Sequence, residues 1–154
     1  MANTLVQLYI HFMFHVKSNN IQMLPEDLPR IFSYISGIIR GLGGTSIATG
    51  GITDHVHNLS SLPKNMSVSA FVKSVKTQSS KWLKTINPMA YGTFAWQDGY
   101  GAFSVSASVL ERVQRYILNQ AEHHRNTKKT YNEEYKEWLE QYHVKYDEQY
   151  AFDN

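Results

Sequence analysis

Apolar side chains recur at every second position near the start of the chain, and this two-residue period restricts the fold more than any other feature. Between residues 5 and 16, every even position from Val6 to Phe14 is apolar. Because successive side chains of a strand point to opposite faces, the pattern predicts a strand with one strongly apolar side. The other side carries His11 and His15, so polar groups are expected on one face of the resulting sheet.

The remaining patterns switch between helix and strand periods. Residues 25–44 open with proline and acidic residues, repeat apolar residues at helical spacing and end in glycines, which is typical of a capped helix. The further segments are predicted as strands at 45–53 and 52–62, a helix at 67–84, a strand at 93–106, and helices at 108–124 and 132–143.

The order β-α-β-β-α-β predicts an α+β, ferredoxin-like (split βαβ) domain, in which an antiparallel sheet has two helices on one face. An extra C-terminal helix carrying Tyr116 is expected beyond this unit. We predict one domain over residues 1–130, with a C-terminal helix and an aromatic, acidic tail over residues 131–154 packing on the same domain.

Composition excludes several classes of protein. A chain of 154 residues with 42% hydrophobic and 18% charged residues is typical of one globular domain, and no apolar run approaches the roughly 20 residues of a membrane span. The N-terminus has no export signal, so no membrane partner and a cytoplasmic location are expected. Because there is no cysteine, any metal must be held by nitrogen and oxygen ligands.

The positive charge is concentrated in the first part of the chain. Residues 1–94 hold eight Lys/Arg against three Asp/Glu, whereas residues 95–154 hold seven against ten. The segment 64–84 contains five lysines and no acid, which favours a polyanionic partner over a membrane. A charge run alone is more typical of a solvated helix face.

The motif His55-Val56-His57 lies in one of the predicted strands, so both imidazoles face the same side of the sheet. Tyr116 and Gln120 are four residues apart on a predicted helix, which places a phenol beside an amide. Imidazole and side-chain oxygen ligands suit Mg²⁺ or Mn²⁺. The combination indicates metal-assisted attack on a phosphate by tyrosine, with no base for the phenol evident in the sequence.

Each of these residues has a simpler explanation when taken alone. A His-x-His pair can be incidental, and a tyrosine such as Tyr116 can be a core aromatic with a solvated hydroxyl. His123 and His124 are interpreted as helix-end residues that interact with the negative end of the helix dipole, not as ligands. His11 and His15 could line the same side of the sheet as the motif.

Three stretches together resemble the single-tyrosine HUH transposases of the insertion sequence 200/605 family, where HUH denotes His, hydrophobe, His. They are Thr-Asp-His-Val-His at 53–57, Trp-Gln-Asp-Gly-Tyr-Gly-Ala-Phe-Ser-Val-Ser at 96–106 and Tyr-Ile-Leu-Asn-Gln-Ala-Glu-His-His at 116–124. The resemblance implies that His55 and His57 bind a divalent metal, that Gln120 is the third ligand, and that Tyr116 is the nucleophile.

The same resemblance implies the partners. Members of this family are homodimers that recognise hairpins at element ends and cut and rejoin single-stranded DNA through a 5′-phosphotyrosine, and one subunit's tyrosine helix can complete the other's metal site. On this basis a set of basic side chains becomes a candidate DNA contact. The set is Arg40, Lys73, Lys76, Lys81 and Lys84.

Other functions remain possible at this stage. Histidine-triad nucleotide hydrolases need a further histidine where this chain has Leu59, which argues against that class. An RNA-binding domain is disfavoured because the aromatic spacing of the sheet-face RNA motif is missing. A non-catalytic or domesticated hairpin-binding protein of the same fold stays open, and the polar residues Asn58, Ser60 and Ser61 depart from the apolar continuation of the histidine strand seen in relatives.

Overall fold

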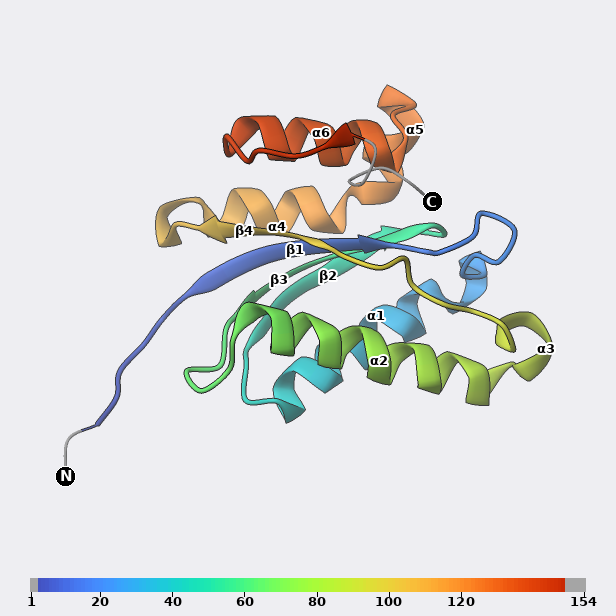
Figure 1. Cartoon of the computed structure of the whole chain (residues 1–154), viewed down its shortest axis with the longest axis horizontal. Coiled ribbons are helices and arrows are strands. Elements are labelled where there is room, and N and C mark those ends of the chain that lie inside the picture. Colours follow the sequence, from blue (N-terminus) through green and yellow to red (C-terminus); the bar gives the residue numbers. More distant parts are fainter. Residues whose placement is uncertain (1–2, 149–154) are drawn as a thin grey trace.

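A four-stranded antiparallel sheet organises the chain, of which the computed structural model describes residues 3–148 (Figure 1). The spatial order of the strands is β2-β3-β1-β4, with β1 in the centre. The strands are β1 (Tyr9–His15), β2 (Ser46–Ile52), β3 (His55–Ser61) and β4 (Gly101–Val105). The α+β class expected from the sequence is confirmed, and β1, α1, β2, β3, α2 and β4 follow one another in the expected order.

The helices α1 (Leu28–Gly41) and α2 (Val68–Ile86) cover one face of the sheet (Figure 1). A 3₁₀ turn at Pro25–Asp27 precedes α1, and the short α3 (Pro88–Tyr91) follows α2. The even-numbered residues of β1 are buried in the main core against both helices. Since each fully buried large apolar side chain stabilises the fold by about 1.5–3 kcal/mol, this layer is the main source of stability.

The opposite face carries α4 (Leu110–Leu118), α5 (Gln120–Thr127) and α6 (Tyr131–Gln141) (Figure 1). The sequence predicted one helix over 108–124, but a 3₁₀ turn occupies 107–109 and Asn119 interrupts the helix with φ −101° and ψ 22°. Asparagine favours such breaks because its side chain competes for backbone hydrogen bonds. Tyr116 therefore lies on α4, and two further helices follow it.

Two of the predicted strands are shorter in the structure. β1 begins at Tyr9, because its partners end opposite it at Ser61 and Val105. The preceding apolar residues have no sheet to cover, and Leu5 is 90% exposed. In the 93–106 segment only β4 is a strand, after Gly99 with φ +87°. β2 pairs antiparallel with β3, the strand that carries the histidine motif, and a turn at residues 53–54 joins them.

The last described residues pack beside α6. The Tyr146 hydroxyl donates to Glu140 Oε1 at 3.2 Å, and Lys136 pairs with Glu148 at 3.1 Å. The part of the predicted tail beyond Glu148 lies outside the described residues. Within residues 3–148, no helix combines the length and the apolar character needed to span a bilayer.

Candidate active site

The two histidines of the motif project from β3 toward the layer formed by α4, α5 and α6. Their alternation sends Val56 into the core under α1 and α2, whereas His55 and His57 face the opposite side and are fully buried. Their Nε2 atoms point at the same carboxylate, that of Glu134 on α6. The prediction that both imidazoles share one face of the sheet is therefore confirmed.

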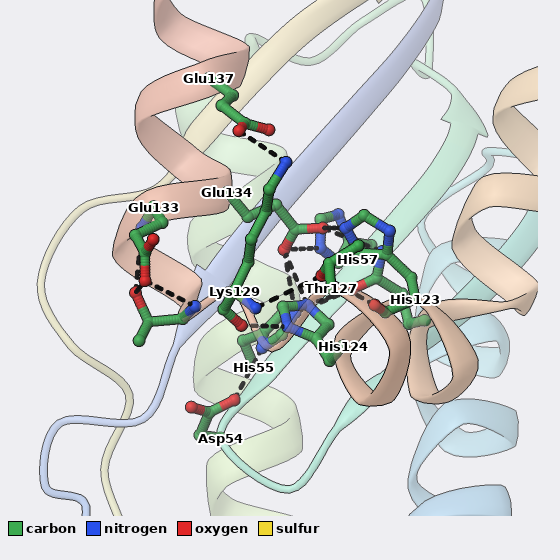
Figure 2. A network of polar contacts seen from close by, with 12 residues as sticks. Asp54, His55, His57, His123, His124, Thr127, Lys129, Glu133, Glu134 and Glu137 are labelled. Carbon is green, nitrogen blue, oxygen red and sulfur yellow. Dashed lines mark hydrogen bonds and ion pairs between the residues drawn. The ribbon is translucent and has the colours of Figure 1, made fainter.

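Glu134 is the centre of the polar cluster, and only 1% of it is exposed. Its Oε1 atom lies 3.2 Å from His55 Nε2, 3.0 Å from His57 Nε2 and 3.2 Å from His124 Nε2. Figure 2 shows this carboxylate facing the three imidazole rings, which come from β3 and α5. His124 does lie in the last turn of α5, as interpreted from the sequence, but its side chain is buried inside this cluster.

Tyr116 and Gln120 reach the same carboxylate from α4 and the start of α5. The Tyr116 hydroxyl and the Gln120 amide both donate to Glu134 Oε2, the amide at 3.0 Å. Gln120 Oε1 in turn lies 2.9 Å from His55 Nε2 and 3.1 Å from His124 Nε2. The four residues predicted from the sequence to form the site thus converge within a single chain. They are His55, His57, Tyr116 and Gln120.

Each imidazole of the cluster is held by its other ring nitrogen. His55 Nδ1 lies 2.7 Å from Asp54 Oδ1, His124 Nδ1 lies 2.7 Å from the Lys129 carbonyl, and His57 Nδ1 lies 2.8 Å from His11 Nε2. Metal-binding histidines usually show this arrangement, in which one nitrogen is fixed by a hydrogen bond so that the other faces the ion. The donor set therefore fits a divalent metal held by nitrogen and oxygen.

Burial and the mutual charges shift the pKa values in the cluster. Burial disfavours protonated His55, but its hydrogen bonds to Asp54 and Glu134 outweigh burial and raise its pKa to about 9. Burial would raise the pKa of Glu134, yet the surrounding imidazoles hold it far below its usual range. Burial and the charge of Glu134 raise the pKa of Tyr116 above its usual value, so the phenol keeps its proton at neutral pH.

An open hollow of about 480 Å³ lies beside Tyr116 on the outer side of α4 and α5. Its walls include the exposed side chains of Arg112 and Arg115, together with Asn119 and His123. The hollow borders the half-buried Tyr116, and its two guanidinium groups suit a phosphate backbone. Sequence analysis missed these arginines, although both lie within one helical turn of Tyr116.

The basic residues predicted to contact DNA do not lie around this cluster. They belong to α1 and α2, on the opposite side of the sheet (Figure 1). Lys76 is partly buried there and donates to the carbonyls of Gln97 and Gly99 at 2.7 Å each, and burial lowers its pKa. The other predicted contacts are exposed, and they are Arg40, Lys73, Lys81 and Lys84.

An aromatic group accompanies the lysines on that opposite side. The rings of Tyr34 and Trp82 stack with centroids 4.1 Å apart and planes 7° apart. The Arg30 guanidinium lies 5.3 Å from the centre of the Trp82 ring. Tyr34, Trp82 and Lys81 also line one shallow hollow, so two aromatic rings and a lysine side chain lie close together there.

Comparison with known proteins identifies the family. Residues 4–120 match the family model of IS200-like transposases, so the chain belongs to this family. No curated protein sequence matches the chain significantly. The family match includes His55, His57, Tyr116 and Gln120 but ends before His124 and Glu134.

Two solved structures have a similar fold. A protein from Deinococcus radiodurans R1, described as a candidate transposase, has 22% identity and a TM-score of 0.61 over 78% of this chain and 95% of its own. A REP-associated tyrosine transposase bound to a REP hairpin has 15% identity and a TM-score of 0.55 over 80% of this chain and 73% of its own. At these identities the likenesses establish the shared fold.

Proposed function

We propose that this protein is a metal-dependent transposase that nicks and rejoins single-stranded DNA through a 5′-phosphotyrosine on Tyr116. The observation that carries the proposal is the convergence of His55, His57, Gln120 and Tyr116 on one buried point in one chain. Membership of the IS200-like family gives the class of reaction. We also propose that the protein acts in the cytoplasm.

His55 and His57 would hold a Mg²⁺ or Mn²⁺ ion through Nε2, and Gln120 would add its amide oxygen. Such an ion acts as a Lewis acid toward a scissile phosphate. The chain itself orients these ligands, because Asp54 and His11 fix the outer nitrogens of the two imidazoles. Burial of both histidines keeps competing water away from the ligand atoms.

Tyr116 is the proposed nucleophile. Its oxygen forms a bond to the phosphorus while the 3′ oxygen leaves, so the phosphodiester energy is retained for rejoining. The phenolic proton points at Glu134 Oε2, which makes this carboxylate the nearest acceptor for it. The hollow lined by Arg112 and Arg115 supports an approach of the DNA strand from the outer side of α4.

Hairpin recognition is proposed for the opposite layer. The stacked Tyr34 and Trp82 rings, with Arg30 and Lys81 beside them, suit unpaired bases and backbone phosphates. A structural neighbour is bound to a REP hairpin, which supports hairpin DNA as the partner. We also propose a homodimer, although Tyr116 and both histidines meet within one chain and need no partner residue.

The test is incubation of the protein with a labelled single-stranded oligonucleotide that carries a hairpin from the flanking DNA of its gene. With Mn²⁺ or Mg²⁺ we expect a covalent protein–DNA adduct on denaturing gels, and with chelator none. Tyr116→Phe should abolish the adduct and retain DNA binding, and His57→Ala should lose metal-dependent cleavage. An adduct that survives Tyr116→Phe would assign the nucleophile to another residue.

The alternative is a non-catalytic hairpin-binding protein of the same fold. One observation favours this alternative. The Glu134 carboxylate lies between the three imidazoles, where it could compete with a metal ion for them. A protein of this kind would bind the labelled hairpin with or without metal and would never form the adduct. The same experiment therefore separates the two functions.

A further inference from the structure

Two side chains of the buried cluster lie beyond residue 120, where the match to the family ends. They are His124 on α5 and Glu134 on α6. We propose that both are ligands of the same cation as His55 and His57, so that α6 supplies one ligand of the metal centre. This inference rests on the proposed function and adds two ligands that lie beyond the part of the chain matched by the family model.

The distances from Glu134 Oε1 to the three imidazole nitrogens are those of neighbouring ligands around one ion. In an octahedral site with bonds of about 2.1 Å, adjacent ligand atoms are about 3.0 Å apart. Glu134 Oε1 lies 3.2, 3.0 and 3.2 Å from the Nε2 atoms of His55, His57 and His124. Ligand atoms of His55, His124 and Glu134 all lie within 4.8 Å of one another, and all three residues are buried.

The hydrogen-bond acceptors that face one another in the cluster also indicate a cation site. The Lys129 carbonyl can only accept, so His124 carries a proton on Nδ1 and, when neutral, directs a lone pair from Nε2 into the cluster. That lone pair meets Gln120 Oε1 at 3.1 Å and Glu134 Oε1 at 3.2 Å, both of which are acceptors. His55 also has an acceptor at each ring nitrogen, with Asp54 Oδ1 2.7 Å from Nδ1 and Gln120 Oε1 2.9 Å from Nε2. One divalent cation satisfies all of these acceptors at once.

The helix that carries Glu134 packs on the sheet through its apolar side chains. A capping box between Thr130 and Glu133 starts α6, and Tyr131 and Leu139 are buried in a cluster with residues of β1 and β4. Gly101 of β4 leaves the necessary room, because a Cβ there would lie 2.6 Å from the ring of Tyr135. Glu134 thus comes from a helix that is docked on the sheet, and binding of the ion should stabilise this docked position.

Mn²⁺ binding to the full chain tests the assignment, with free Mn²⁺ measured by electron paramagnetic resonance. We expect Glu134→Gln and His124→Asn each to weaken binding by about 10-fold or more, since loss of supporting groups around a metal already costs 10–100-fold. The matched control is Glu137→Gln, one turn further along α6, where the side chain is 55% exposed and its carboxylate pairs with Lys129 at 2.7 Å. This control should change the Mn²⁺ affinity less than about twofold.

A second measurement does not depend on the variants folding. Hydrogen exchange of the wild-type chain should show slower exchange of the α6 amides when Mn²⁺ is added. Unchanged or faster exchange would overturn the proposal, as would Mn²⁺ affinity that is unchanged or tighter in Glu134→Gln. Tighter binding would mean that the carboxylate competes with the ion for the imidazoles.

The outcomes also separate this inference from the proposed function. If the wild type binds Mn²⁺ and forms the tyrosine adduct while both variants bind Mn²⁺ normally, only the assignment of His124 and Glu134 fails. If the wild type binds no Mn²⁺ and forms no adduct, the proposed function fails together with it.

Discussion

Gly50 on β2 controls how closely α4 approaches the sheet, and replacing it by alanine is expected to displace Tyr116. A Cβ built at this position would lie 2.1 Å from the Ile117 carbonyl oxygen and 3.0 Å from the Ile117 carbonyl carbon. Ordinary van der Waals contact begins near 3.4 Å, so α4 has to retreat by about 1.3 Å. Ile117 follows Tyr116 directly, and the hydroxyl moves with it.

The displacement predicts two separate losses. Overpacking of this kind typically destabilises a protein by about 1–3 kcal/mol, which urea unfolding would measure. A reacting group misplaced by about 1 Å can lose on the order of 100-fold in rate, which single-turnover formation of the Tyr116–DNA adduct would measure. Loss of activity should therefore persist in conditions where the variant is fully folded.

Gly41→Ala is the matched control, because a Cβ there meets nothing within 4 Å. It should leave the rate of adduct formation unchanged. If Gly50→Ala keeps both the stability and the adduct rate of the wild type, the reasoning that couples β2 to the position of Tyr116 is refuted.

Three further predictions concern separate parts of the molecule. Asp54→Asn should weaken Mn²⁺ binding by about 10-fold, because the Asp54 carboxylate lies 2.7 Å from His55 Nδ1 and orients this imidazole. A Mn²⁺ titration that gives the wild-type affinity would contradict this role of Asp54. Tyr91→Phe should lower the free energy of unfolding by about 1–3 kcal/mol, since its buried hydroxyl donates to Asp27 at 2.6 Å and accepts from the Leu24 amide at 2.9 Å. A urea unfolding curve identical to that of the wild type would exclude this role. Removing Arg112 or Arg115 should reduce the slope of log affinity against log salt by about 0.7 each for single-stranded DNA, and an unaltered slope would exclude the hollow beside Tyr116 from the DNA path.

Much of the fold and part of the site could be predicted from the sequence, because strand and helix periods depend on local backbone geometry. The two-residue period of β3 sends Val56 into the core and both motif histidines into the site. The spacing of Tyr116 and Gln120 survives even the helix break at Asn119, since both side chains still donate to the same carboxylate.

Only the tertiary structure decided what completes the site. Glu134 lies 77 residues after His57 in the chain, and nothing in its local sequence distinguishes it from Glu133 or Glu137. Its position follows from the docking of α6 on β1 and β4, a long-range event governed by side-chain packing. Packing of α2 in the main core places the predicted lysines on the far side of the sheet. An amphipathic pattern specifies which side of a helix is buried but not which face of the sheet the helix covers.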